Sequence, residues 1–230
     1  EGCVIKMDNQ LNTIIWSTYL GGTGDDAIYS LALDQRDDIY ITGGTTSSDF
    51  PTTTNAYQSS YQDSIGVDAF ITKISNNGNQ IFTSSYFGTN RYDQSYFVEI
   101  GSENNIYLFG QTKATGLQLV SNAPYSVEGG GQFVAVFNEG LTTLIRSTVF
   151  GTGKGSPDIS PTAFLVDVCN KVYIAGWGSN LGGPLSTLNL PVSYDGYQQD
   201  TDGNDLYLMV LDDALGGIVY ATYFGGSQSN

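Results

Sequence analysis

An acidic segment near the C-terminus, residues 200–205, has the residue types and spacing of a calcium-binding turn. Its sequence, Asp-Thr-Asp-Gly-Asn-Asp, places oxygen-bearing side chains at alternate positions around a glycine. Calcium is bound in proteins by carboxylate, amide and carbonyl oxygens, and tight glycine-containing turns bring such groups together. Calcium is therefore the one cofactor that the sequence suggests, and its candidate ligands are Asp200, Asp202, Asn204 and Asp205.

Turn formation is a competing interpretation of the same segment. The loop at residues 63–68 occupies the equivalent place in an earlier repeat and has Ile65 where Asp202 stands. Because aspartate also stabilises turns and strand ends by accepting hydrogen bonds from backbone amides, the shared acids do not require a metal. Both interpretations remain open from the sequence.

Four further residues are candidates for ligand binding. Asp25 and Asp26 close a turn with the sequence Gly-Gly-Thr-Gly-Asp-Asp, and they could hold a cation or accept hydrogen bonds from the amides of their own turn. Asp68 lies at the start of an apolar stretch. Trp177 ends another apolar stretch, and its indole ring could stack on a sugar or pack against a loop.

Histidine is absent from all 230 residues, and this limits the chemistry of the chain. Ser-His-Asp and Cys-His nucleophile systems and imidazole metal sites all need histidine, so these residues can form none of them. Acid–base catalysis would instead need a pair of carboxylates, as in glycosidases. No pair stands out among the acids, so we predict no enzymatic activity and assign no catalytic residues.

The charge of the chain excludes several classes of partner. Asp and Glu number 23 against 8 Lys and Arg, which gives a formal net charge of −15. A surface of this sign repels nucleic acids and anionic membranes, so we expect neither as a partner. The sequence has no apolar run of 18 or more residues and no basic segment followed by an apolar one, so we expect no membrane insertion and no secretory signal within these residues.

The two cysteines lie at non-equivalent positions. Cys3 falls at a predicted core position of a strand, whereas Cys169 falls in a predicted turn. We therefore expect two free thiols rather than a disulfide. The abundance of Gly and Tyr and the scarcity of Lys favour an extracellular β protein.

An internal repeat defines the elements that position these residues. Phrases similar to Ser-Thr-Tyr-Leu-Gly-Gly begin at positions 17, 84, 147 and 221. An apolar stretch precedes each phrase, and a stretch of the type Ile-Tyr-Ile-x-Gly follows the first three. Such β-branched and aromatic runs, bounded by Gly, Asn and Asp, are typical of strands. Repeats of this length are supersecondary units that must pack on their neighbours.

Each complete repeat unit reads as four antiparallel strands. In the first unit we predict them at 28–34, 38–44, 68–75 and 80–87. Units of this kind, apolar on both faces, predict an all-β fold in which each unit is a four-stranded blade of a β-propeller. The loops after the second and fourth strands emerge on one face and gather many of the acids there. The predicted divisions of this propeller segment, residues 1–230, are a half blade at 1–20 and blades at 21–88, 89–151 and 152–226.

About three and a half blades do not close a ring without further strands. Propellers commonly close by joining strands from both ends of a polypeptide into one blade. We therefore expect the native polypeptide to continue past Asn230 and to begin before Glu1, so that the rest of a propeller is the first partner of these residues.

Several motifs resemble a known family, the bacterial β-propeller repeats called SBBP repeats. The resemblance covers nearly the whole chain and is weaker in the second unit, which lacks Phe-Pro-Thr. The matching motifs are Ser17 to Gly22, Asp25-Asp26, Ile39 to Gly43, Asp49 to Thr52 and Asp68 to Phe70.

Two other segments, Tyr92 to Phe97 and Asp158 to Phe164, are similar to the propeller regions of large gliding-motility-associated surface proteins of Bacteroidota. Those proteins resemble cargo of the type nine secretion system. The resemblance thus implies an exported protein at the bacterial cell surface.

These observations favour a non-catalytic propeller module of a large exported surface protein, with a role in adhesion, glycan binding or spacing. One alternative is a propeller glycosidase or lyase that uses loop carboxylates. Another is a subunit or bound substrate of a secretion or gliding-motility assembly. The partners expected are accordingly a glycan or protein ligand at the surface and the secretion or motility machinery.

Overall fold

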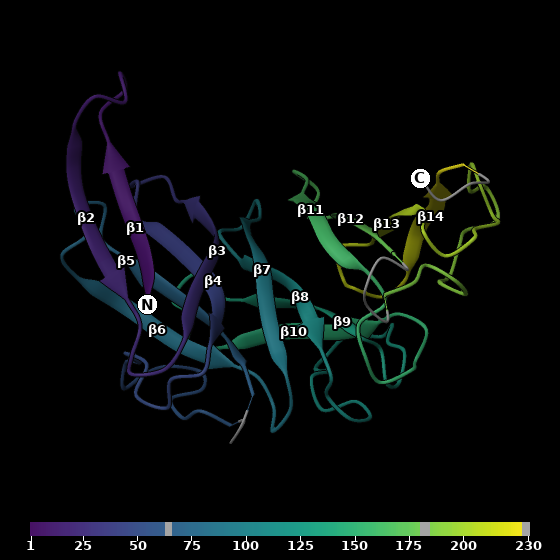
Figure 1. The fold of residues 1–230 in the computed structure, drawn as a ribbon, viewed down its shortest axis with the longest axis horizontal. Coiled ribbons are helices and arrows are strands. Elements are labelled where there is room, and N and C mark those ends of the chain that lie inside the picture. Colours follow the sequence, from purple (N-terminus) through teal and green to yellow (C-terminus); the bar gives the residue numbers. More distant parts are fainter. Residues whose placement is uncertain (63–65, 180–184, 227–230) are drawn as a thin grey trace.

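The computed structural model describes residues 1–62, 66–179 and 185–226, and this part of the chain is built from strands (Figure 1). It contains 14 strands, which form one two-stranded and three four-stranded antiparallel sheets. Across those three ranges no helix is long and apolar enough to cross a membrane. Each sheet consists of strands that are consecutive in the chain, so every sheet corresponds to one unit of the repeat.

We number the sheets as blades in chain order. Blade 1 is the two-stranded sheet of β1 (Gly2–Met7) and β2 (Ile14–Leu20). Blade 2 contains β3 (Asp26–Leu33), β4 (Ile39–Thr45), β5 (Asp68–Ile74) and β6 (Ile81–Phe87). Blade 3 contains β7 (Asp93–Ile100), β8 (Ile106–Thr112), β9 (Gln132–Phe137) and β10 (Leu144–Phe150). Blade 4 contains β11 (Ser160–Val166), β12 (Val172–Trp177), β13 (Leu206–Leu211) and β14 (Ile218–Phe224).

The blades are arranged in an arc. The first strands of the complete blades, β3, β7 and β11, lie on its concave side, and successive first strands contact each other (Figure 1). Within each blade the strand order follows the chain from this inner strand to an outer fourth strand. The predicted all-β fold with four-stranded antiparallel propeller blades is therefore confirmed.

The inner strand of blade 2 begins at residue 26, earlier than the predicted residue 28, and the inner strands of blades 3 and 4 begin at residues 93 and 160. Each has a β-bulge near its start, where the pairing skips Tyr29, Tyr96 or Thr162. A bulge inserts an extra residue and breaks the alternation of inward and outward side chains. The pattern of alternating residues therefore could not reveal the first residues of these strands.

The same bulge explains the glycine of the repeated Ile-Tyr-Ile-x-Gly motif. A Cβ atom on Gly43 would overlap the backbone carbonyl of Ala27, and one on Gly110 would overlap the carbonyl of Gln94. Gly176 faces the Ser160 carbonyl in the same way. Glycine is needed at this position because the bulged inner strand passes too close for any side chain.

Hydrophobic cores fill the junctions between blades. Phe87 of blade 2 packs against Phe133 and Phe137 of blade 3, with ring centroids 5.2 Å and 5.5 Å apart. Phe109 of blade 3 stacks on Phe164 of blade 4 at 5.5 Å. Three such clusters join the four blades, so the stability of each blade depends on its neighbours.

Hydrogen bonds to one recurring turn position join the blades on the opposite side from the long loops. In each case a side chain of one blade donates to a backbone carbonyl in the next blade, in the turn between its third and fourth strands. The bonds are Trp16 Nε1 to Asn76 (3.2 Å), Tyr40 Oη to Glu139 (2.9 Å) and Arg146 Nη1 to Asp213 (2.8 Å).

The prediction that Cys3 occupies a core position is wrong. By strand register Cys3 is equivalent to Phe70 and Phe133, which are fully buried against the preceding blade. In blade 1 no preceding sheet covers this face among the described residues, so Cys3 is exposed. Cys169 is also exposed, and both thiols are free as predicted.

Candidate functional site

The loops on one rim of blade 2 are joined by hydrogen bonds from backbone amides to side chains. Thr23 N donates to the Asp49 carboxylate at 2.8 Å, and Asp25 N donates to Thr46 Oγ1 at 2.7 Å. These bonds connect the turn that precedes β3 with the loop that follows β4. The rim predicted to gather the long loops therefore exists in blade 2, and Asp25 lies on it.

Asp26 holds this turn together. Its carboxylate accepts hydrogen bonds from Gly22 N at 2.8 Å, Thr45 Oγ1 at 2.5 Å and Ser47 Oγ at 3.0 Å. The residue is 8% exposed. A buried carboxylate with three donors from its own loops is satisfied by the protein, so its main role is to fix the loop geometry.

Equivalent aspartates do the same in the next two blades. Asp93 accepts from Thr89 N at 2.6 Å and from Thr112 Oγ1 at 2.5 Å. Asp158 accepts from Thr152 N at 2.9 Å, and Lys154 forms an ion pair with it at 3.0 Å. This carboxylate belongs to the repeat and is not special to one blade.

A small cavity opens beside this turn at the junction of blades 2 and 3. Its volume is about 240 Å³, which is slightly below the range of about 300–1,000 Å³ that is usual for ligand pockets. Two of the candidate residues from the sequence, Asp25 and Asp26, lie in its wall. We call it the Tyr29 cavity, and its lining residues are Asp25, Asp26, Ala27, Tyr29, Gly44, Thr46, Val67 and Gln94.

Tyr29 gives this cavity an aromatic wall. Tyr29 is the bulge residue of β3 and is 50% exposed, and Tyr96 is the bulge residue of β7. The two rings lie 5.1 Å apart between centroids at an interplanar angle of 38°. Bulges redirect a side chain away from the regular alternation, and here they bring two equivalent tyrosines into contact across the blade junction.

A hydrogen-bonded network fixes the second tyrosine. The Tyr92 hydroxyl lies 3.1 Å from Gln94 Oε1 and 3.2 Å from the Tyr96 hydroxyl, and Tyr96 Oη donates to Gln111 Oε1 at 3.1 Å. Burial raises the pKa of both Tyr92 and Tyr96, so both hydroxyls stay protonated at neutral pH. The network therefore presents a neutral, fixed support for the Tyr29 ring.

A second cavity, about 570 Å³, lies on blade 4 and contains three of the four predicted calcium ligands. Gln198 organises it by donating from Nε2 to the Asp200 carbonyl at 2.7 Å and accepting at Oε1 from Gly225 N at 3.1 Å. The lining residues are Tyr197, Gln198, Gln199, Asp200, Thr201, Asp202, Asp205, Gly225 and Gly226.

The acids of this cavity do not converge on one point. Asp202 Oδ1 accepts from Asn204 N at 2.9 Å, which is a local turn bond. Among the residues with described positions, no group of three or more Asp, Glu or Cys side chains has the geometry to hold a metal ion. Residues 63–65 of the loop compared with this segment lie outside the described residues. Calcium binding therefore stays a prediction.

Asp68 and Trp177 line neither cavity. Asp68 is fully buried at the start of β5, where its carboxylate accepts from Gln62 N at 2.8 Å. Trp177 is 39% exposed at the end of β12, at the register position that Gln111 occupies in blade 3. Gln111 donates from that position to the Ile159 carbonyl of the next blade at 2.7 Å, so Trp177 stands at a blade-packing position.

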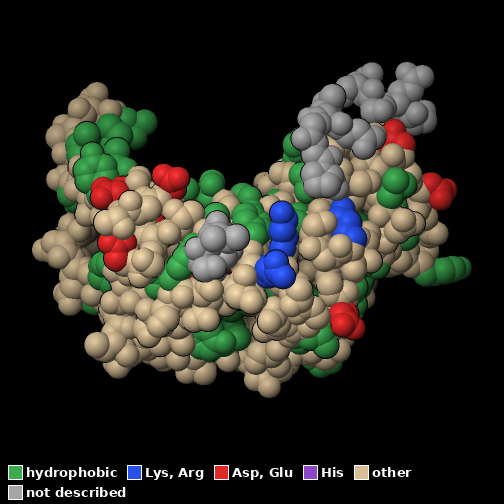
Figure 2. Space-filling model, turned by 60° about the horizontal axis from the view of Figure 1, so that its bottom comes forward, with side chains coloured by type: hydrophobic (Ala, Val, Ile, Leu, Met, Phe, Trp, Pro, Cys, Tyr) green, Lys and Arg blue, Asp and Glu red, His purple; other side chains and the backbone are tan. Residues whose placement is uncertain are grey.

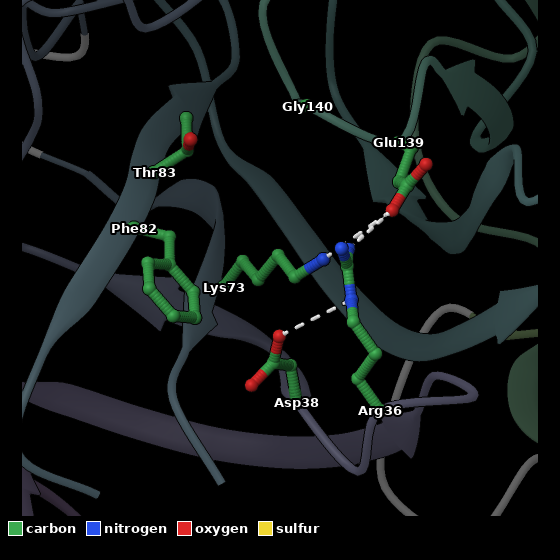
Figure 3. Close-up of a pocket in the computed structure, with 7 residues that line it drawn as sticks. All are labelled: Arg36, Asp38, Lys73, Phe82, Thr83, Glu139 and Gly140. Atoms are coloured by element: carbon green, nitrogen blue, oxygen red, sulfur yellow. Dashed lines mark hydrogen bonds and ion pairs between the residues drawn. The ribbon is translucent and has the colours of Figure 1, made fainter.

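A charged pocket lies on the opposite rim, between blades 2 and 3. Figure 3 shows Arg36 and Lys73 converging on Glu139, with Asp38 on the other side of Arg36. Lys73 also bonds to Asp34 at 2.8 Å, and both of these side chains are less than 10% exposed. The pocket has a volume of about 400 Å³, but its charged groups are already paired with one another. We therefore interpret it as a cluster of ion pairs that connects the two blades, not as a ligand site.

The sequence could not identify the Tyr29 cavity as a whole. It pointed to Asp25 and Asp26, but it gave no reason to select Tyr29, Tyr96 or Gln94. The available signal was the recurrence of tyrosine at positions 29 and 96 of two aligned inner strands. Only the bulges and the packing of adjacent blades show that these two rings meet.

Comparison with known proteins supports the assignment of a β-propeller repeat. No curated protein sequence matches the chain. A family model described as SBBP, a β-propeller repeat, matches residues 15–51, which include β3 and the turn with Asp25 and Asp26. Residues 15–51 therefore carry an SBBP-type β-propeller repeat, and the described part of the chain is built from β-propeller blades.

Proposed function

We propose that this chain is a non-catalytic β-propeller module that binds a neutral glycan at the Tyr29 cavity. The observation that carries the proposal is the half-exposed Tyr29 ring, held against Tyr96 and placed beside the side chains of Asp25, Thr46 and Gln94. A fixed aromatic surface next to a few polar groups is the usual composition of a small-molecule site.

The chemistry of this wall suits a sugar ring. The C–H face of a pyranose is apolar and packs on an aromatic ring, while its hydroxyl groups both donate and accept hydrogen bonds. Asp25 is exposed and supplies acceptor oxygens, and the Gln94 amide can donate or accept. A cavity of about 240 Å³ fits one ring-sized group, so we propose that a longer chain is held by one residue at a time.

The charge of the protein selects against acidic polysaccharides. The chain carries a formal net charge of −15, and two acids line the cavity itself. An anionic glycan would be repelled both at a distance and at contact. We therefore propose a neutral ligand.

Two observations support binding without catalysis. The Asp26 carboxylate is engaged by three donors of its own loops, so its oxygens are directed at the protein. Asp25 is the remaining acid of the cavity wall, and a glycosidase needs two carboxylates that face the substrate.

We also propose that the module works outside the cell as part of a surface protein. The composition supports this, with 29 Gly, 16 Tyr and only 8 Lys and Arg. The resemblance of Tyr92 to Phe97 and of Asp158 to Phe164 to segments of exported surface proteins supports it as well. Adhesion to a neutral polysaccharide at the cell surface is the role that joins this location to the Tyr29 cavity.

The proposal is tested by measuring binding to a panel of neutral and acidic polysaccharides by affinity gel electrophoresis, followed by calorimetry on the best ligand. The Tyr29→Ala variant should lose about tenfold in affinity, corresponding to roughly 1.4 kcal/mol of ring stacking. Tyr29→Phe should keep most of it. Tyr194→Ala is the matched control, because Tyr194 is 99% exposed and outside the cavity. Equal affinity of Tyr29→Ala and the unmodified chain would refute the proposal.

A further inference from the structure

Gly44 keeps the Tyr29 cavity open. By strand register the same position holds Gln111 in blade 3 and Trp177 in blade 4. A Cβ atom on Gly44 would lie only 2.8 Å from Val67 Cγ1 and 3.1 Å from Gln94 Cγ, and both of these residues line the cavity. Blade 2 therefore has no side chain at the position where the other two complete blades have a large one.

In blade 3 an amide group takes the place that is open in blade 2. Gln111 Nε2 donates to the Ile159 carbonyl of blade 4 at 2.7 Å, and the Tyr96 hydroxyl donates to Gln111 Oε1 at 3.1 Å. Tyr96 is the bulge residue equivalent to Tyr29, so the Gln111 amide contacts the counterpart of the ring that forms the wall of the Tyr29 cavity. The chain thus fills one blade junction with its own amide and leaves the preceding junction open.

Gln94 provides a hydrogen-bond donor with a fixed orientation at the open junction. Gln94 is 9% exposed, and its Oε1 lies 3.1 Å from the Tyr92 hydroxyl. Because this oxygen faces a hydroxyl donor, Nε2 is the half of the amide that can donate to a ligand. A carbonyl oxygen in the cavity would therefore meet a donor that the protein has already oriented.

The wall of the cavity also provides an acceptor and an apolar surface. Asp25 is exposed and stands where Tyr92 stands in blade 3, since each directly precedes an inner strand and its carbonyl accepts from the loop after the second strand. The Tyr92 hydroxyl lies 3.2 Å from the Gln111 amide oxygen, so this position contacts the amide in blade 3. In blade 2 the Asp25 carboxylate can instead accept from an N–H group. Val67 and Ala27 add methyl groups to the same wall.

We propose that the Tyr29 cavity recognises the N-acetyl group of a neutral N-acetylhexosamine residue, and that Gly44 leaves the space for this group. The choice of the group rests on glycan binding at the Tyr29 cavity, which it makes more specific. The acetamido oxygen accepts a hydrogen bond from Gln94 Nε2, and the acetamido N–H donates one to the Asp25 carboxylate. The methyl group lies against Val67 while the pyranose ring packs on Tyr29.

The charge around the cavity agrees with this ligand. An acetamido group is uncharged, so the formal net charge of −15 does not repel it. Figure 2, which views the arc from the side of the loops after β4 and β8, shows a surface made mostly of uncharged polar side chains and backbone between scattered charged groups. A carboxylate in place of the acetamido group would be repelled by Asp25.

A hydroxyl group at the same carbon of the sugar should be a poorer match. It has no methyl group to cover Val67, and it leaves unfilled the space that a side chain at position 44 would occupy. A site that is built to hydrogen-bond a particular group discriminates against an analogue that lacks the group. The cavity should therefore distinguish two sugars that differ only at this carbon.

Calorimetric titration with two matched trisaccharides tests this preference. Triacetylchitotriose and cellotriose are both neutral and have the same linkages, and they differ in whether each ring carries an acetamido or a hydroxyl group at the second carbon. The unmodified chain should bind triacetylchitotriose at least about tenfold more tightly than cellotriose. Tyr29→Ala should weaken the binding of triacetylchitotriose by about tenfold.

Two variants connect the preference to individual residues. Gly44→Gln gives blade 2 the side chain that blade 3 has at this position, so it should abolish binding of triacetylchitotriose. Gly140→Gln is the matched control, because the nearest atoms to a Cβ there are 3.7 Å away, and it should bind normally. Asp25→Ala changes an exposed residue and should reduce the preference for triacetylchitotriose over cellotriose to about threefold or less. Circular dichroism and urea unfolding show whether each variant is folded.

The outcomes separate this proposal from the function on which it rests. Equal affinity for the two trisaccharides, with both lost in Tyr29→Ala, would overturn the choice of the N-acetyl group while glycan binding at the cavity stands. Binding of triacetylchitotriose that persists in folded Gly44→Gln would overturn the role of Gly44. A chain that binds neither trisaccharide and no other neutral glycan would overturn both proposals.

Discussion

The backbone carbonyl of Gln94 occupies the space in which a side chain on Gly110 would lie. The same relationship holds between Ala27 and Gly43 one blade earlier. The bulge brings a carbonyl of the inner strand close to the second strand. The same bulge therefore explains both the glycine of the Ile-Tyr-Ile-x-Gly motif and the shape of the inner edge of the blade.

Replacement of this glycine should therefore disrupt the inner edge of a blade. Gly110→Ala should lower the free energy of unfolding by about 1–3 kcal/mol, because a methyl group must displace the backbone or the Phe133 ring. Urea unfolding followed by tryptophan fluorescence measures the change. Gly140→Ala is the control, since the nearest atoms to its Cβ would be 3.7 Å away, and an equal loss in both variants would contradict this explanation.

The buried aspartate of each turn should depend on its threonine partner. Thr112→Val removes the hydroxyl that donates to Asp93 at 2.5 Å and accepts from Ala114 N at 2.8 Å. A buried carboxylate that loses a donor should reduce stability by about 1–3 kcal/mol. Thermal unfolding should show the loss, whereas Thr143→Val, at an exposed position, should remain within about 0.5 kcal/mol of the unmodified chain. Similar effects of the two variants would argue against this role.

The Lys73–Asp34 pair should make stability depend on pH. Burial opposes the charge on both groups, but their mutual contact, with amides of Arg36 and Asp38 donating to Asp34, lowers the pKa of Asp34 and raises that of Lys73. A lowered carboxyl pKa contributes stability above the value in the unfolded chain, and that contribution is lost as the pH falls through the lower folded value. A raised lysine pKa contributes below the unfolded value and is lost as the pH rises through the folded one.

We therefore expect unfolding midpoints to fall in acid, below the ordinary aspartate pKa of 3.8, and again above the ordinary lysine pKa of 10.5. The double variant Lys73→Met with Asp34→Asn should have a flatter profile at both ends. Denaturant titrations at closely spaced pH values measure this. A profile for the double variant that is parallel to that of the unmodified chain would show that the pair does not contribute.

Tyr86 should add a second dependence on alkaline pH. Burial raises the pKa of its hydroxyl to about 12, and this hydroxyl donates to the Ser47 carbonyl at 2.7 Å and accepts from Phe50 N at 3.1 Å. The unfolded chain loses this proton near pH 10, so the folded state should lose stability between pH 10 and about 12. Tyr86→Phe should lack this part of the decline, and an unchanged alkaline slope would contradict the assignment.

The recurring Ile-Tyr-Ile and Thr-Tyr-Phe phrases were sufficient to predict the blades, because strands that are buried on both faces produce long apolar runs in sequence. The start of each inner strand was missed, since a bulge interrupts the period at Tyr29 and Tyr96. Contacts between blades could not be predicted either, because no local sequence pattern indicates that Lys73 contacts Glu139 or that Tyr29 contacts Tyr96. Asp25 and Asp26 were selected correctly as neighbours of a cavity, but only the hydrogen bonds separate the exposed acid from the one that holds the turn.

Glycan binding at the Tyr29 cavity is tested most directly by NMR on chain with ¹³C-labelled tyrosine rings, titrated with a neutral oligosaccharide. Assignment by Tyr29→Phe and Tyr96→Phe variants identifies the two ring signals. Saturable shifts of the Tyr29 and Tyr96 signals, with no change for the exposed ring of Tyr194, are the predicted result. Shifts confined to Tyr194 or Tyr197, with Tyr29 unaffected at saturation, would contradict it.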